Sequence, residues 1–265
     1  MNESVRLERD GAVAAIVLHR PEALNALDGD MMARMRRAAE QVEADASVRA
    51  VVIRGEGPAF LAGGDVKLFH RRIRELPALI LAVGPDLNAA VLALRRMGKP
   101  VLASVHGAVA GAGISLVAAA DLAIAADDAR FTLAYSRIGA CPDGGATYCL
   151  PRLVGEKKAL ELMFLSEAFD AATAQALGLV NWVVPAATLQ AKTREIAARL
   201  AEGPTFAYGE TKALVYGLQD GALARRMEEE IRAFARCAVT ADMAEGVAAF
   251  VEKRAPRFVG EGIKV

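Results

Sequence analysis

The chain has 265 residues, and its 32 lysine and arginine residues balance its 32 aspartate and glutamate residues, so its formal net charge is zero. A nucleic-acid-binding surface needs an excess of basic residues, so this balance argues against nucleic acid as a partner. Cys141, Cys149 and Cys237 show no CxxC spacing. This argues against a zinc or other metal site and favours a reducing compartment.

Two segments bear on targeting and membranes. The first six residues carry charges where a signal peptide has its apolar core, so we expect no export signal. Residues 101–126 are apolar enough to suggest a membrane span, but they contain Ser104, Asp121 and three glycines. A buried strand, turn, helix and strand explains them better. We therefore expect a cytoplasmic protein without a membrane partner.

The elements begin with a β-hairpin, because two short apolar segments flank the Asp10-Gly11 turn. We expect strands at residues 5–9, 13–18, 50–54, 101–105, 122–125, 131–133 and 180–184. Asp28 and Asp170 are predicted helix caps. We expect helices at residues 28–44, 67–74, 85–98, 159–164 and 170–178, and then almost continuous helix from residue 186, with breaks near residues 203–204 and 221.

This order predicts an α/β core followed by an α-helical extension. We place the core at residues 1–200 and a helical oligomerisation region at residues 201–265. The helical region carries more apolar side chains than a peripheral helix pair buries, which predicts a subunit interface. The alternative is packing on the same chain's core. The side chains concerned are Phe206, Leu214, Leu218, Met227, Ile231 and Phe234.

Two glycine-rich loops follow apolar strands. One contains Gly63 and Gly64, and the other contains Gly107, Gly111 and Gly113 before a helix-forming run. A strand-to-helix turn of this kind directs free backbone N–H groups outward, where they hold an anion or a developing oxyanion. Two such loops can supply one N–H each to a single carbonyl oxygen. The alternative is that both loops are only tight turns.

These loops belong to a series of motifs that runs along essentially the whole chain. The series comprises Asn25-Ala26-Leu27, the loop 59–67, Lys99-Pro100 leading into Gly111-Ala112-Gly113, Leu150-Pro151-Arg152-Leu153-Val154-Gly155, Gly178-Leu179-Val180-Asn181 and the tail 250–254. Together the motifs resemble the crotonase superfamily, which includes enoyl-CoA hydratases and isomerases.

The resemblance implies a crotonase-like spiral of β-β-α units that holds an acyl-CoA thioester as substrate, with no tightly bound cofactor. It implies that the N–H groups of Gly64 and Ala112 hold the thioester oxygen. Preorganised donors at this oxygen favour the enolate over the ground state, so they accelerate the reaction.

The chain departs from the hydratases of this family at two positions. Ser115 and Tyr135 stand where those enzymes place their two glutamates. Near neutral pH a serine or tyrosine hydroxyl is a poorer proton shuttle than a tuned carboxylate, although it can hold a water or donate a hydrogen bond. Hydration by two carboxylates is therefore not expected.

Asp143 lies in the segment Pro142-Asp143-Gly144-Gly145. The resemblance places this segment over the acyl end of the substrate, which makes Asp143 the remaining acid there. Some isomerases of the family, including those that rearrange ring-epoxide acyl-CoA intermediates, and the aromatic acyl-CoA dehalogenases carry an aspartate at this point. Apolar neighbours would raise its pKa and suit it to take and return a proton. The alternative is that Asp143 caps a helix that begins near Gly144.

Six further residues are predicted to contact coenzyme A. The resemblance places Ala26 and Ala62 at backbone contacts, and Phe250 and Lys253 at contacts often made from a neighbouring subunit. Lys67 begins a basic cluster that can meet the phosphates, while Asp65 follows the first loop and is expected to cap the next helix. The resemblance also implies a homotrimer, or a hexamer built from two trimers.

We therefore expect an acyl-CoA isomerase that shifts a C=C bond or a ring-oxygen arrangement through an enolate, with Asp143 as its one acid and base. One alternative is an enoyl-CoA hydratase, or an acyl-CoA hydrolase or dehalogenase, in which Asp143 activates water or attacks directly. Another is a non-catalytic acyl-CoA binder that has kept the fold and lost the glutamates.

Overall fold

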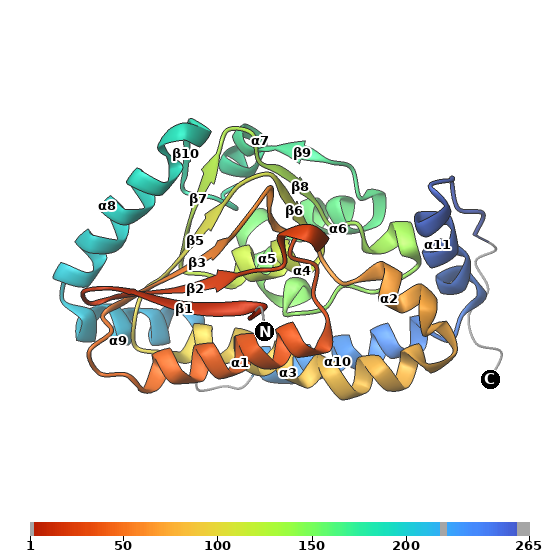
Figure 1. Ribbon diagram of the computed structural model, residues 1–265, viewed down its shortest axis with the longest axis horizontal. Coiled ribbons are helices and arrows are strands. Elements are labelled where there is room, and N and C mark those ends of the chain that lie inside the picture. Colours follow the sequence, from red (N-terminus) through yellow and green to blue (C-terminus); the bar gives the residue numbers. More distant parts are fainter. Residues whose placement is uncertain (1–2, 218–221, 259–265) are drawn as a thin grey trace.

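Two β-sheets form the centre of the molecule in the computed structural model, which describes residues 3–217 and 222–258 (Figure 1). The six-stranded sheet has the order β1-β2-β3-β5-β7-β10, and the four-stranded sheet has the order β4-β6-β8-β9. The strands are β1 (Val5–Asp10), β2 (Val13–Leu18), β3 (Ala50–Gly55), β4 (Ala59–Leu61), β5 (Val101–Val105), β6 (Ala108–Ala110), β7 (Leu122–Ala126), β8 (Arg130–Thr132), β9 (Phe169–Asp170) and β10 (Trp182–Val184).

From β3 to β8, consecutive strands alternate between the two sheets. β3 pairs with β5 and β5 with β7 in the larger sheet, while β4 pairs with β6 and β6 with β8 in the smaller one, all in parallel. Each pair of strands is followed by helix, which gives the repeated β-β-α units expected of a crotonase-like spiral. The predicted α/β core with a C-terminal helical extension is confirmed.

The helices lie in layers around the sheets. α1 and α3 pack together, and α10 packs on α3, below the sheets in Figure 1. α8 lies against the opposite face of the larger sheet, on β3, β5 and β7. The helices are α1 (Gly29–Ala44), α2 (Val66–Arg71), α3 (Leu76–Arg96), α4 (Ala112–Ala119), α5 (Ala146–Val154), α6 (Glu156–Leu165), α7 (Ala171–Ala176), α8 (Leu189–Glu202), α9 (Thr205–Tyr216), α10 (Ala222–Cys237) and α11 (Ala241–Glu252), with short 3-10 turns η1 (Pro21–Ala23), η2 (Ile73–Glu75), η3 (Tyr135–Ile138) and η4 (Ala186–Thr188).

Side chains alternate along the strands of the larger sheet and so point to both of its faces. The central strands are buried on both sides, because the main core covers one face and α8 covers the other. Val51 and Ile53 of β3 join the main core, whereas Val52 between them packs in a second cluster with Leu102 and Leu189 of α8. The continuous apolar runs of these strands are therefore explained by a parallel sheet covered on both sides. The glycine-rich loops lie on the main-core side.

Helix α3 corrects the prediction that a helix opens at Pro85. The helix begins at Leu76, with Pro85 inside it. A proline inside a helix removes one hydrogen bond and costs about 3 kcal/mol, but Leu76, Ile80 and Leu87 are buried along this helix and offset that cost. Residues Ile73–Arg96 are long and apolar enough to cross a membrane by length and composition alone, a weak indication that core helices share.

The helical extension is partly packed on the same chain. Met227, Ile231 and Phe234 of α10 are buried in the main core, so for these three residues packing within the chain is correct. Phe206 and Leu214 of α9 remain more than four-fifths exposed, at 82% and 81%. Leu218, the sixth predicted interface residue, lies outside the described residues.

Candidate active site

The two glycine-rich loops approach each other closely. A Cβ atom added at Gly111 would lie 3.4 Å from Cα of Gly63, and one added at Gly63 would lie 3.3 Å from the carbonyl oxygen of Ala110. Both glycines have positive φ angles, +51° and +92°, which side chains rarely tolerate. The sequence thus needs glycine here to bring the two backbones together.

Each loop contributes an N–H group without a protein acceptor. Leu27 forms a parallel β-bridge with Gly64: the N–H of Leu27 donates to the carbonyl of Gly63, and the N–H of Asp65 donates to the carbonyl of Leu27. In such a bridge the N–H of Gly64 points away from Leu27. Ala112 is the first residue of α4, where helical N–H groups lack partners. Within the described residues, neither N–H donates to a protein acceptor. Both N–H groups are therefore free to donate to an oxygen atom, as the predicted oxyanion hole requires.

Asp143 is held by Ser115 and Tyr135, the two residues predicted to stand at the glutamate positions. The hydroxyl of Tyr135 donates to Oδ1 of Asp143 at 2.7 Å, and Oγ of Ser115 donates to the backbone carbonyl of Asp143 at 2.9 Å. Ser115 and Tyr135 are buried, with exposures of 0% and 7%. Both hydroxyls therefore fix the position of Asp143.

Asp143 lies where the chain packs on α4 and α3, and its burial raises its pKa. A Cβ atom at the adjacent Gly144 would lie 3.4 Å from Leu87 of α3. Burial raises the pKa of Asp143 to about 6, and the hydrogen bond from Tyr135 opposes that rise. Burial, followed by the charge of Asp143, raises the pKa of Tyr135 well above its ordinary value, so this hydroxyl keeps its proton.

Aromatic rings connect the first loop with the acid. The ring of Phe69 from α2 lies against Gly64, since an added Cβ there would be 2.7 Å from Cζ of Phe69. Phe69 meets Phe234 of α10 edge to face at 6.1 Å, and Phe234 meets Tyr135 in the same way at 6.5 Å. The rings form an apolar boundary between the Gly64 loop and Asp143.

The alternative role of Asp143 as a helix cap is wrong. Helix α5 begins at Ala146 and its N-cap residue is Gly145. The side chain of Asp143 makes no capping hydrogen bond to any described residue of this helix. The buried carboxylate of Glu230, from α10, instead accepts hydrogen bonds from the N–H groups of Gly145 and Thr147. The sequence analysis missed Glu230, because 85 residues separate it from Gly145 and no local cap signal marks it.

Two of the residues predicted to contact coenzyme A, Ala26 and Asp65, lie beside Arg20. Its guanidinium donates to the carbonyl of Ala26 at 2.6 Å and lies 3.3 Å from Asp65. Asp65 also caps α2 through the N–H of Leu68, as predicted. The N–H of Ala62 donates to the carbonyl of Leu24, so the segments that carry the two predicted backbone contacts are hydrogen-bonded to each other.

The remaining predicted contacts are on two helices that pack together. Lys67 is exposed on α2, while Phe250 is 56% exposed near the end of α11 and Lys253 follows that helix. α11 packs on α2 and on η3 of the same chain. A Cβ atom at Gly246 would lie 2.6 Å from the backbone of Ile138, so α11 sits directly against the turn that carries Tyr135.

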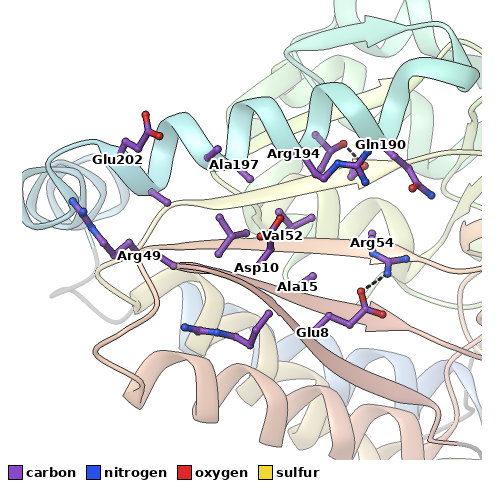
Figure 2. Close-up of a pocket in the computed structure, with 17 residues that line it drawn as sticks. Glu8, Asp10, Ala15, Arg49, Val52, Arg54, Gln190, Arg194, Ala197 and Glu202 are labelled. Carbon is purple, nitrogen blue, oxygen red and sulfur yellow. Dashed lines mark hydrogen bonds and ion pairs between the residues drawn. The ribbon is translucent and has the colours of Figure 1, made fainter.

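A separate cavity of about 520 Å³ lies between the outer face of the larger sheet and α8 (Figure 2). Val52, Ser104 and Ala197 line it, and these side chains point away from the main core. Arg54 at its edge is paired with Glu8 at 2.6 Å, as the dashed line in Figure 2 shows. This cavity is on the opposite face of the sheet from Asp143. In the described part of the chain, no three His, Cys, Asp or Glu side chains are grouped as metal ligands.

Comparison with known proteins identifies the family. The model of the enoyl-CoA hydratase/isomerase family matches residues 8–261. The chain belongs to this family. Its crotonase-type fold also agrees with a crystal structure of an enoyl-CoA hydratase from Mycobacterium avium subsp. paratuberculosis, with a TM-score of 0.87, 30% identity, and coverage of 97% of this chain and 98% of that one.

Two relatives of the enoyl-CoA hydratase/isomerase family match along their whole length. A 1,2-epoxyphenylacetyl-CoA isomerase of Escherichia coli is 34% identical, covering 98% of this chain and all of that protein. A probable enoyl-CoA hydratase of Rhodobacter capsulatus is 36% identical, covering 97% of this chain and 98% of that protein. The family acts on acyl-CoA thioesters, and its members carry out more than one reaction.

Proposed function

We propose that the protein is an acyl-CoA isomerase in which Asp143 is the single acid and base. One observation carries the proposal: Tyr135 donates to the partly buried carboxylate of Asp143, and Ser115 donates to the backbone carbonyl of the same residue. The family resemblance predicts that hydratases have glutamates at positions 115 and 135. The similarity to an epoxyphenylacetyl-CoA isomerase supports it. The substrate class is an enoyl-CoA or a related ring-containing acyl-CoA.

The proposed reaction begins with proton transfer. Asp143 in its ionised form takes a proton from the carbon chain next to the thioester, and the negative charge moves to the thioester oxygen. The N–H groups of Gly64 and Ala112 stabilise that oxygen, and each such donor is worth about 3 kcal/mol. Asp143 then returns the proton to a different carbon. In a ring-containing acyl-CoA the enolate first shifts the neighbouring ring oxygen from one ring carbon to another position, and Asp143 gives the same proton back to the rearranged product. A single acid and base suffices because both transfers occur on one face.

Exchange of substrate protons in heavy water tests the proposal. We expect the protein to exchange the α-protons of a saturated acyl-CoA and to move the double bond of a 3-enoyl-CoA. Asp143→Asn should reduce both rates by about 10²- to 10⁴-fold, because general acid–base catalysis contributes that much. Binding of the acyl-CoA, measured by calorimetry, should change little. Undiminished exchange in Asp143→Asn would refute the assignment.

The same incubation in heavy-oxygen water separates the alternatives. Isomerisation incorporates no solvent oxygen into the product, whereas hydration of crotonyl-CoA or hydrolytic dehalogenation of an aromatic acyl-CoA does. Incorporation that depends on Asp143 would replace the isomerase proposal with a hydratase or hydrolase. Tight binding of acyl-CoA without proton exchange would identify a non-catalytic binder.

We also propose that the protein is a homotrimer or a hexamer whose contacts include α9. Phe206, Leu214 and Val215 expose 82%, 81% and 72% of their surface on this helix. Exposed apolar patches of this kind are typical of interfaces. Light scattering should give a multiple of three times 27.9 kDa, and Leu214→Glu should lower that mass. A wild-type monomer would overturn the proposal.

The coenzyme A contacts remain part of this proposal. Lys67 and Lys253 are placed to meet phosphates, and Ala26 and Ala62 to contact the nucleotide and pantetheine through their backbones. Lys67→Ala and Lys253→Ala should each raise the KM for acyl-CoA several-fold without lowering kcat, since they remove binding common to the ground and transition states. An unchanged KM in both variants would remove these lysines from the site.

A further inference from the structure

Glu230 connects the C-terminal helical region with the segment that carries Asp143. Its Oε2 accepts from the N–H of Gly145 at 2.7 Å, and its Oε1 accepts from both the N–H and the Oγ of Thr147, at 2.9 and 2.6 Å. The residue is 2% exposed. Both carboxylate oxygens are therefore occupied by α5, and Glu230 is not itself free to exchange protons with a substrate.

A buried carboxylate is a costly way to cap a helix. Most caps are side chains of the residue immediately before the helix, as Asp28 is for α1 and Asp170 for α7. At α5 that position is Gly145, which has no side chain. Three hydrogen bonds and the positive end of the helix dipole offset part of the desolvation of Glu230. The arrangement fixes α5 to α10 at one point.

That point lies two residues after Asp143. Gly144, between Asp143 and this point, and Gly145 itself have φ angles of +63° and +82°. Glycine pairs of this kind bend readily. Asp143 is held from one side by Tyr135 and Ser115. The backbone on its other side is held at Gly145 by Glu230. The N–H of Ala146 also donates to the carbonyl of Asp143 across this turn, at 3.2 Å. Without the contact to Glu230, that single long bond would be left to hold the two glycines, and the carboxylate of Asp143 could move.

We propose that Glu230 is a positioning residue for Asp143, fixing the Gly144-Gly145 hinge so that the carboxylate stays in line with the reacting carbon. The proposal rests on the proposed function of Asp143 as the acid and base. Displacement of a reacting group by about 1 Å costs roughly 10²-fold in rate. A loss of this size in kcat, without loss of substrate binding, is the expected signature.

Glu230→Gln tests this role. A glutamine side chain has an NH2 donor where Glu230 has its second acceptor oxygen. This donor would face a backbone N–H group, so glutamine cannot accept from both Gly145 and Thr147. We expect kcat for α-proton exchange, per folded enzyme, to fall about 10- to 100-fold, with KM for the acyl-CoA within about 3-fold of wild type. Hydrogen exchange of the peptide spanning residues 143–149 should speed up.

A second pair of variants guards against misfolding of Glu230→Gln. Thr147→Ser keeps the hydroxyl that donates to Glu230 and should retain wild-type kcat, whereas Thr147→Val removes only that donor and should lower kcat several-fold. Asp170→Asn, which alters the cap of α7 through Thr173, is the matched control and should leave kcat and KM unchanged.

The outcomes distinguish this proposal from the proposed function. If the wild type exchanges protons and Asp143→Asn does not, but Glu230→Gln and Thr147→Val both retain wild-type kcat, the positioning role is refuted and the function stands. The role is also refuted if these variants change only the melting temperature. If the wild type exchanges no protons, the proposed function itself fails, and no variant is needed to show it.

Discussion

Replacing Tyr135 with phenylalanine isolates the hydrogen bond that tunes Asp143. The change removes one hydroxyl from a buried ring and keeps the ring's edge-to-face contact with Phe234. The lost bond, 2.7 Å from the hydroxyl to Oδ1, stabilises the ionised carboxylate more than the protonated one. The pKa of Asp143 should therefore rise in Tyr135→Phe.

The size of the rise follows from the strength of such a bond. A hydrogen bond to a charged group is worth about 1.5–3 kcal/mol, and one pKa unit corresponds to about 1.4 kcal/mol, so the shift is about 1–2 units. The pKa of Asp143 would move from about 6 to roughly 7–8. Because the base must be ionised, α-proton exchange at pH 6.5 should fall roughly 3- to 20-fold and recover at pH 9.

The assay is the pH profile of kcat/KM for proton exchange, which reports the pKa of the free enzyme. The matched control is Tyr216→Phe, because Tyr216 also donates to a carboxylate at 2.7 Å, that of Asp121, away from the site. Its profile should coincide with that of the wild type. An acid limb in Tyr135→Phe that stays in place, or moves to lower pH, would refute the reasoning.

Three further predictions concern backbone geometry and buried charge. Gly111→Ala, at φ +51°, should cost about 1–3 kcal/mol of stability and about 10² in exchange rate, whereas Gly11→Ala, at φ +56° with open space around it, should leave exchange unchanged. Equal exchange rates would contradict this. The pKa of Glu230 rises on folding from 4.5 to about 7. Glu230 therefore adds about 3 kcal/mol to the free energy of unfolding below pH 4.5, and this stabilisation is lost as the pH rises through 7. In urea titrations the free energy of unfolding of Glu230→Gln should change less with pH than that of the wild type, and an equally steep change would contradict this. Lys212→Met should lower the free energy of unfolding by about 3–5 kcal/mol, because it leaves Asp121 without its buried cation, and a loss below about 1 kcal/mol would disprove the estimate.

Local signals in the sequence were sufficient for much of the fold. The caps Asp28, Asp65 and Asp170 were predicted correctly because each bonds an N–H group three residues away. The glycine-rich loops were predicted because a positive φ needs glycine. The start of α3 was not, since burial along the helix outweighs the preference of Pro85 for a helix start.

The contacts that organise the candidate site are not local, and they were missed. A hydroxyl at position 115 was expected to hold a water or donate a hydrogen bond; it donates one, but the acceptor is a carbonyl 28 residues away that no local signal indicates. Glu230 was invisible as a cap because its partners lie 83 and 85 residues earlier in the chain. Such contacts depend on how α10 packs on α3 and α5, which no short spacing in the sequence encodes.

The tethering of Asp143 by Ser115 and Tyr135 restricts how this site can be redesigned or can evolve. Substituting glutamates at positions 115 and 135, to imitate a hydratase, would remove both hydroxyls that hold Asp143 and add two carboxylates beside it. Like charges at such short range resist ionising together. In the proposed one-acid mechanism, a change at either position alone would therefore disturb Asp143 before a second pair of carboxylates is in place.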